Sequence, residues 1–206
     1  MPRARVLIVA RTRMGGGRVC VGGLTEEGES IRLMNQNCSS SLAQNSPYEV
    51  GELWDIEFAP CGEQRPPHIE DVAVTAAGRI RKISDITGFI LSLVVPWQGG
   101  IDCLFDGKIQ FTGPGAGYIS ETDVPTNAIG FWLPDRPLNL EQDQRNHSGY
   151  YPEADLRHLS YVGAAPAIPT IQAGQLVRVS LARWWKPADA DPDFELRCYA
   201  QLSGWY

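Results

Sequence analysis

The chain has 206 residues, of which 43% are hydrophobic and 20% are charged, and these proportions exclude a mainly disordered protein. Its formal net charge is -6, and this acidic balance argues against tight non-specific DNA binding, which depends on many Lys and Arg side chains. The 21 glycines and 15 prolines favour many short strands over long helices.

The apolar segments are too short for a membrane span or a signal peptide. The longest, at 89–95, falls far short of the roughly 20 residues that cross a bilayer. The apolar run at 6–10 is followed by Arg11 and Arg13 instead of a small-residue cleavage site. We therefore expect a cytoplasmic protein that makes no contact with a membrane.

The cysteines are few and widely spaced, and no C-x-x-C pair occurs. An odd number at this spacing argues against a disulfide framework and against a metal site. We therefore expect free thiols in a reducing cytosol. The five are Cys20, Cys38, Cys61, Cys103 and Cys198.

The first third of the chain reads as a series of strands. Apolar residues at 6–9 predict the first strand, and the glycines at 15–17 supply the positive φ that a hairpin turn needs. Strands are also expected at 19–24 and, from its alternating pattern, at 30–34. The Asn- and Ser-rich segment 35–47 predicts a surface loop.

Two more strands are predicted before the middle of the chain. Polar and apolar residues alternate from Leu53 to Phe58, which indicates a half-buried strand that begins after Gly51. After a turn rich in Pro and Gly, the segment 68–74 predicts the returning strand.

A single helix is predicted from Asp85 to Val95, because apolar residues there recur at the i, i+3, i+4 and i+7 positions of one helix face. Ser84 is the expected N-cap and Pro96 the expected stop. Residues 97–126 are Gly-rich and irregular, and we interpret them as a connection.

The second half of the chain repeats the pattern of the first. Residues 174–182 (GQLVRVSLA) align without gaps with residues 51–59 (GELWDIEFA). At nearly the same offset, segments 128–134 and 156–163 match the first and third predicted strands. Two copies of a roughly five-stranded unit explain this pattern, and closure of each copy into a barrel would remove its exposed edges. The alternative is two unrelated sheets that share a common strand pattern.

Several stretches together resemble the dual OB-containing domain family of bacterial proteins. They are VARTRMGGGRVCVGG at 9–23, GFWLPD at 130–135, SLARWW at 180–185 and RCYAQLSGWY at 197–206. The resemblance runs over almost the whole chain and implies two OB-like barrels in tandem. It also implies a nucleic-acid-binding or sensing module of the kind often encoded near prokaryotic conflict and defence components, and it carries no catalytic residues with it.

The predicted fold class is therefore mainly β, with two tandem OB-like small barrels and one short helix in the connection. The first barrel is expected at 1–80, the helix and irregular connection at 81–126, and the second barrel at 127–206.

The segment 182–186 (ARWWK) carries the main candidate for ligand binding. Neighbouring side chains of a strand project to opposite faces, so Trp184 and Trp185 cannot both point into one core. One indole is expected near solvent, where the flanking Arg183 and Lys186 would place phosphate-binding cations beside a stacking platform. The other interpretation is that the pair plugs a barrel end or the seam between the two halves.

Arginines surround the predicted glycine turn at 15–17. Residues 1–35 carry six Arg and three Glu, a local charge of +3. Arg11 and Arg13 share one face of a strand, and with Arg18 they flank a turn that a ligand backbone could approach closely. We expect phosphate contacts here; solubilising charges on a hairpin tip are the alternative.

Motifs for catalysis and metal binding are incomplete in this sequence. The glycine-rich 113–117 lacks the Lys-Ser/Thr of a P-loop. The acidic 189–195 starts like a calcium loop but has Phe194 where that loop needs Gly. The H-x-E at 68–70 is not followed by P-C-x-x-C. We expect no enzyme activity, no cofactor and no metal.

The predicted function is a non-catalytic module that binds single-stranded or structured nucleic acid, as an accessory of a prokaryotic defence system. A protein-interaction adaptor without nucleic-acid binding is the alternative, and a protein partner encoded in the same operon fits both. A third possible function is an enzyme that uses Asp55 and Glu57 as catalytic acids. The simpler interpretation is that these two side chains form the solvent-exposed face of a strand. The predicted contact residues are Arg11, Arg13, Arg18, Arg183, Trp184, Trp185 and Lys186.

Overall fold

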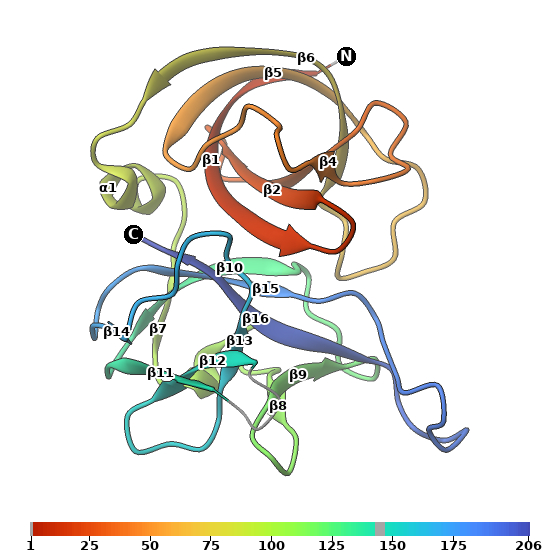
Figure 1. Cartoon of the computed structure of the whole chain (residues 1–206), viewed down its shortest axis with the longest axis vertical. Coiled ribbons are helices and arrows are strands. Elements are labelled where there is room, and N and C mark those ends of the chain that lie inside the picture. The colour runs from red at the N-terminus through yellow and green to blue at the C-terminus, as the bar shows by residue number, and fades with distance from the viewer. Residues whose placement is uncertain (1, 143–146) are drawn as a thin grey trace. The chain divides into compact units, whose positions relative to one another are not determined.

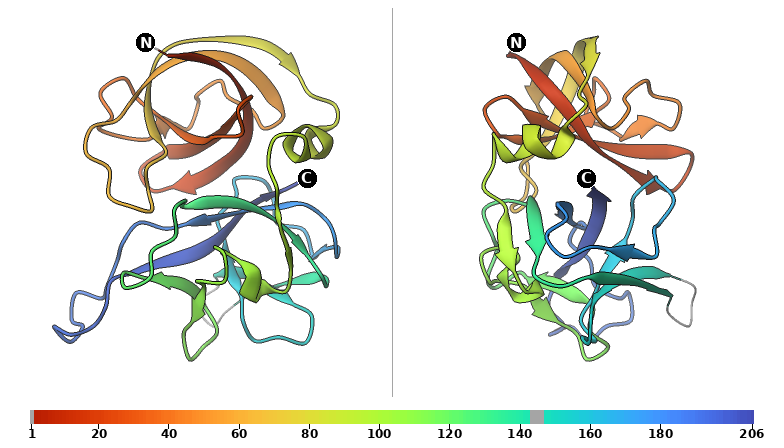
Figure 2. Two further views of the ribbon diagram at one scale, coloured as in Figure 1. Left: turned by 180° about the vertical axis from the view of Figure 1, so that it is seen from behind. Right: turned by 90° about the vertical axis from the view of Figure 1, so that its left-hand side faces the viewer.

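The structure is a computed structural model that describes residues 2–142 and 147–206. The chain divides into two compact units. The first comprises Met1–Val95, Gly163–Ala165 and Tyr206, and the second comprises Pro96–Val162 and Pro166–Trp205. Figures 1 and 2 show the first unit mainly in red to olive and the second in green to blue.

The first unit is a closed barrel of five main strands. The sheet order is β1-β5-β6-β3-β2, and a further pairing of β1 with β2 closes it. The pairing of β3 with β6 is parallel, and the other pairings are antiparallel. The elements are β1 (Arg3–Met14), β2 (Arg18–Thr25), β3 (Ser30–Met34), the short β4 (Leu42–Ala43), β5 (Glu52–Pro60), β6 (Asp71–Lys82) and α1 (Ile86–Leu91).

Strand alternation builds the core of the first barrel. Val6 and Ile8 of β1 are fully buried in one hydrophobic cluster with Trp54 and Ile56 of β5. β1 is long enough to pair with β5 through its first residues and with β2 through its later ones, so a single strand closes the barrel. The cluster consists of Val6, Ile8, Val19, Val21, Ile31, Leu33, Tyr48, Trp54, Ile56 and Val72.

The second unit repeats this topology. β10 (Ile129–Pro134) pairs with β15 (Val177–Leu181), and β11 (Leu138–Gln142) pairs with β12 (Ser148–Pro152), so β10 and β11 together take the place of β1. The last elements are β13 (Leu159–Tyr161) and β16 (Arg197–Trp205), which pair in parallel as β3 and β6 do. Short additions are β7 (Trp97–Gly99), the 3-10 helix η1 (Ile101–Cys103), β8 (Gln110–Phe111), β9 (Gly117–Ser120) and β14 (Thr170–Ile171).

The predicted sequence repeat corresponds to β5 and β15. Gly51 and Gly174, which the alignment pairs, both have positive φ, at 87° and 72°, so each supplies the turn before the equivalent strand. The strand after each then returns beside its neighbour, as β6 and β16. The prediction of a mainly β fold with two OB-like barrels is confirmed.

Three local predictions need correction. The helix spans only Ile86–Leu91, and the hydroxyl of its C-cap, Ser92, donates to the carbonyl of Phe89 at 2.7 Å. Its N-cap is Asp85 instead of Ser84, since the Asp85 carboxylate accepts the Gly88 N–H at 2.8 Å. The strand predicted at 68–74 begins only at Asp71.

The region predicted as an irregular connection contains β7, β8, β9 and η1. These elements have two to four residues each, too few for a periodic pattern to reveal. Among the described residues, no helix is long and apolar enough to cross a bilayer.

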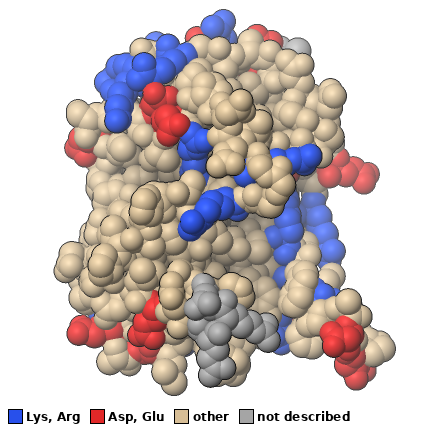
Figure 3. All heavy atoms as spheres, in the orientation of Figure 1, with Lys and Arg blue, Asp and Glu red and all other residues tan. Residues whose placement is uncertain are grey.

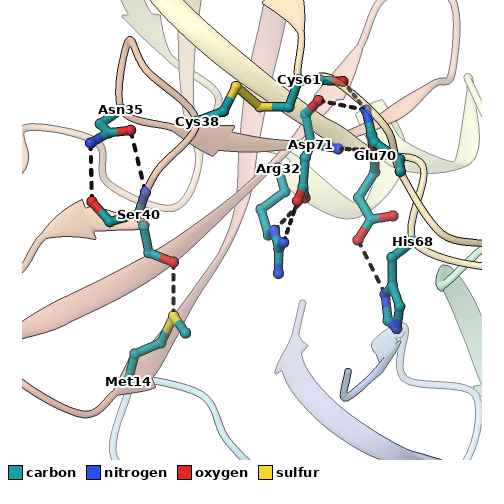
Figure 4. Close-up of polar contacts among 11 residues, drawn as sticks. Met14, Arg32, Asn35, Cys38, Ser40, Cys61, His68, Glu70 and Asp71 are labelled. Atoms are coloured by element: carbon teal, nitrogen blue, oxygen red, sulfur yellow. Dashed lines mark hydrogen bonds and ion pairs between the residues drawn. A yellow bond between two sulfur atoms is a disulfide. The ribbon is translucent and has the colours of Figure 1, made fainter. Parts of the chain in front are cut away.

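Cys38 and Cys61 form a disulfide, so the expectation of free thiols is wrong for these two residues. Cys38 lies in the loop after β3 and Cys61 directly follows β5 (Figure 4). They are 23 residues apart in sequence, but β3 and the end of β5 both pair with the first residues of β6, and the Cα atoms of the two cysteines are 5.7 Å apart. Sequence spacing alone does not show such proximity. Cys20, Cys103 and Cys198 are free.

An ion pair joins the same two strands beneath the disulfide. The Arg32 guanidinium of β3 donates to both carboxylate oxygens of Asp71 on β6, at 2.6 and 2.5 Å (Figure 4). Burial raises the pKa of Asp71, and the charge of Arg32 opposes that rise. The bidentate geometry fixes the register at the start of the parallel pair.

Candidate nucleic-acid interface

The ARWWK segment lies in the loop that joins β15 to β16, at residues 182–196. In the OB topology this is the loop between the fourth and fifth strands, one of the two loops with which OB folds hold oligonucleotides and oligosaccharides. Two backbone hydrogen bonds anchor it: the Trp185 N–H donates to the Arg197 carbonyl and the Arg197 N–H to the Trp185 carbonyl, each at 3.0 Å. Trp185 therefore has a fixed backbone position.

The two tryptophans have different environments, as predicted, although they lie in a loop instead of a strand. Trp184 is half-buried and packs against the core of the second unit. Trp185 is 51% exposed. The interpretation of the pair as a structural plug thus fits Trp184, and the interpretation as a stacking platform fits Trp185.

Trp185 belongs to a group of aromatic rings and one arginine. These residues lie on β9, on β16 and in the loop that joins β15 to β16. The Trp185 and Tyr199 ring centroids are 6.0 Å apart, and those of Tyr199 and Tyr118 are 6.2 Å apart. The Arg197 guanidinium carbon lies 4.2 Å from the Tyr118 centroid and 4.5 Å from that of Phe194. We call these residues, Tyr118, Trp185, Phe194, Arg197 and Tyr199, the aromatic–arginine surface; Tyr118, only 6% exposed, is its buried base, and Trp185 is its most exposed ring.

Hydrogen bonds hold Arg197 in place on this surface. Its Nε donates to the Glu195 carboxylate at 3.0 Å, and the Ser120 hydroxyl also donates to that carboxylate. The hydrogen bond from Ser120, followed by those from Arg197, keeps the pKa of Glu195 below its ordinary value, so Glu195 is ionised at neutral pH. Burial raises the pKa of Tyr118, which stays a neutral phenol.

The charges around Trp185 are mixed. Arg183 and Lys186 are exposed, and the Lys186 ammonium is 3.5 Å from the carbonyl oxygen of Pro192. Farther along the same loop stand the exposed Asp189, Asp191 and Asp193. A ligand bound here would gain more from the rings than from long-range attraction of its phosphates.

Arg11 has a structural task in the first unit. Its guanidinium donates to the carbonyls of Tyr48 and Gln44, each at 2.9 Å, and to the carboxylate of Glu49. These bonds tie the segment 44–49 to β1. The Arg11 side chain is therefore committed to the protein, which the period-2 pattern of Arg11 and Arg13 does not reveal.

Arg13 and Arg18 are exposed beside the glycine turn. Gly16 and Gly17 have φ values of 70° and 67°, as the predicted hairpin turn requires. In the OB topology this turn is the loop between the first two strands, the other loop that OB folds use for ligands. The predicted residues thus divide between the two units: Arg13 and Arg18 in the first, and 183–186 in the second.

Three rings of the aromatic–arginine surface were not among the predicted site residues: Tyr118, Phe194 and Tyr199. Tyr199 has a signal in the sequence, because Arg197, Tyr199 and Gln201 alternate with buried Cys198 and Ala200. Tyr118 joins them only because β9 pairs with β16, a long-range contact without a sequence pattern. Among the described residues, no group of three or more His, Cys, Asp or Glu could hold a metal ion.

Comparison with known proteins agrees with the two-barrel topology. No curated protein and no solved structure matches the chain. The family model of the dual OB-containing domain matches residues 4–205. The match covers both barrels, and the chain belongs to the dual OB-containing domain family.

Proposed function

We propose that this protein is a non-catalytic module whose second barrel binds single-stranded nucleic acid at the aromatic–arginine surface. The observation that carries the proposal is Trp185, a half-exposed indole with a fixed backbone in a loop that OB folds use for ligands. Family membership supports it, since a dual OB domain suggests a nucleic-acid- or protein-binding module.

Binding would combine stacking with a few phosphate contacts. A base would stack on the Trp185 indole, and Tyr199 would extend the apolar platform. The exposed cations Arg183 and Lys186 would contact the backbone phosphates. A duplex keeps its bases stacked on one another, so the site should prefer a single strand.

The test measures fluorescence anisotropy of labelled single-stranded DNA and RNA oligonucleotides. Trp185→Ala should weaken binding by about 5- to 150-fold, the equivalent of one lost stacking contact of about 1–3 kcal/mol. Trp185→Phe keeps a smaller ring, so its oligonucleotide affinity should fall between those of the wild type and Trp185→Ala. Leu156→Ala, which shortens an exposed apolar side chain of the same unit, should leave the affinity unchanged.

Trp184 is not a suitable target for this test. Because it packs against the core, Trp184→Ala would destabilise the barrel and confuse folding with binding. Wild-type protein with no measurable affinity for either oligonucleotide, or Trp185→Ala protein that binds as tightly as the wild type, would refute the proposal.

Two further parts of the proposal concern the cell. We propose that the protein is an accessory of a prokaryotic defence system, on the resemblance described above, and that it works in the cytoplasm. The Cys38–Cys61 disulfide makes the compartment testable, since disulfides are rare in a reducing cytosol. A thiol count on protein alkylated within its native cells decides between the two: three thiols mean that the disulfide forms and indicate an oxidising compartment, whereas five mean that it is reduced, as in the cytoplasm.

A further inference from the structure

The second half of β6 has one edge without a neighbouring strand. Residues 76–82 pair with β5, whereas β3 pairs with β6 only at 71–73. No other strand in the described part of the chain pairs with β6, and residues 76–82 are all exposed. Figure 2 shows this end of the strand at the margin of the first barrel. Backbone N–H and C=O groups on this edge are thus open to another strand, with one irregularity at Ile80, where the pairing with β5 shifts register.

The side chains of this stretch are basic. The end of β6 carries Arg79, Arg81 and Lys82. Figure 3 shows Lys and Arg side chains gathered at the upper left of the molecule. Arg79 donates to Glu52 at 2.6 Å, whereas no ion pair joins Arg81 or Lys82 to another residue that the structure describes. Ile80, between Arg79 and Arg81, is 45% exposed.

We propose that this edge binds an extended acidic segment of a partner protein by strand addition. Main-chain hydrogen bonds would provide affinity, and alternate side chains would provide specificity. Arg81 and Lys82 are neighbours and project to opposite faces, so the partner strand would present a carboxylate on each face, one to each cation, and an apolar side chain beside Ile80.

Charge decides against the other occupants of this edge. A second copy of β6 would set cations opposite cations, and like charges directly across a strand pair are destabilising. The phosphates of a nucleic acid would use the cations but leave the open backbone groups and Ile80 without partners. An acidic strand satisfies all three features.

The probe is a fluorescent peptide that carries Glu on both faces of the strand and Val opposite Ile80, is long enough to span residues 76–82, and is titrated with the full chain. We expect saturable binding and slower hydrogen exchange of the amides at 76–82. A second peptide, methylated on alternate backbone nitrogens, keeps the charge but cannot complete the ladder, so it should not bind. This comparison separates strand addition from simple charge attraction.

Matched charge reversals locate the binding. Arg81→Glu/Lys82→Glu should weaken peptide binding by about tenfold or more. Arg183→Glu/Lys186→Glu changes the net charge equally but lies in the second unit, so it should leave peptide affinity unchanged and lower oligonucleotide affinity.

Three results would overturn the inference. They are equal binding of the methylated peptide, wild-type peptide affinity in the Arg81→Glu/Lys82→Glu protein, and loss of oligonucleotide affinity alone in that protein. Because the two double variants affect different probes, failure at β6 leaves the proposal for Trp185 standing, and the reverse also holds.

Discussion

Arg11 and Arg13 are two residues apart on β1, yet the Arg11 side chain is largely buried and the Arg13 side chain is exposed. Arg11 bonds two backbone carbonyls and the Glu49 carboxylate, which hold the segment 44–49 against the strand. A guanidinium with this many internal partners stabilises the barrel through hydrogen bonds from a charged donor. Its contribution belongs to folding, whereas the ring of Trp185 is free to serve a ligand.

The change Arg11→Ala should lower the free energy of unfolding of the first unit by about 1–3 kcal/mol, because it removes these bonds and leaves two carbonyls without their donor. Arg18→Ala, at an exposed position, should change it by no more than about 0.5 kcal/mol. Urea denaturation measures both. Equal stability of the two variants would show that the Arg11 bonds contribute nothing net.

Glu195 makes the aromatic–arginine surface sensitive to acid. Hydrogen bonds, first from Ser120 and then from Arg197, lower its pKa in the folded protein below the ordinary value of 4.5. A depressed pKa means that this stabilisation is complete above about pH 4.5 and is lost as the pH falls through the folded value.

The stability difference between wild type and Glu195→Gln should therefore be larger at pH 7 than at about pH 3, and thermal unfolding at both values measures it. Glu153→Gln is the control, since Glu153 is exposed and makes no ion pair with any residue in the described ranges. A difference that is independent of pH would contradict the role given to Glu195.

At the level of elements, the disulfide connects the loop after β3 to the loop after β5. Both loops border the parallel pair β3–β6, whose connection along the chain is long. A covalent link across 23 residues removes conformations from the unfolded chain, an effect worth about 3 kcal/mol for a loop of this length in the chain-entropy model.

We expect Cys38→Ser/Cys61→Ser to be less stable than the oxidised wild type by about 3 kcal/mol and to lose its response to reductant. Chemical denaturation with and without dithiothreitol tests this, and Cys103→Ser, which removes a free thiol, is the control. If reductant lowers the stability of the double variant as much as that of the wild type, the disulfide is not the cause.

The N-cap of α1 can be tested directly, because the sequence and the structure assign it to different residues. Asp85→Ala should destabilise the protein by about 1 kcal/mol, because the Gly88 N–H loses its acceptor. Ser84→Ala, one residue earlier, should have almost no effect. Thermal unfolding of both variants decides between the two caps, and a larger loss for Ser84→Ala would restore the prediction made from sequence.

The elements that sequence could predict are those with a local cause. The strands β5 and β15 follow from alternation after a glycine with positive φ, and the exposure of Trp185 follows from its place beside Trp184. The disulfide, the cluster of Tyr118 with Arg197, and the bonds of Arg11 depend on contacts between residues that are distant in the sequence. No local pattern carries that information.

For the whole molecule, the distribution of charge over the surface says more about ligand binding than the net charge does. The net charge is -6, while exposed cations occur both at the end of β6 and beside Trp185. The three aspartates in the loop of Trp185 offset its two exposed cations, Arg183 and Lys186. A site of this kind recruits its ligand by contact instead of by a long-range field, since opposite charges within a Debye length largely cancel.

Oligonucleotide affinity should therefore depend only weakly on salt. Two phosphate contacts on a single strand give a slope of about -1.4 in log affinity against log salt, or about a sevenfold loss between about 50 and 200 mM. Anisotropy titrations across this range measure the slope, and Arg183→Glu/Lys186→Glu should bring it close to zero. A loss of about a thousandfold would require many phosphate contacts, which a surface with this charge balance does not provide, and would place the binding elsewhere on the chain.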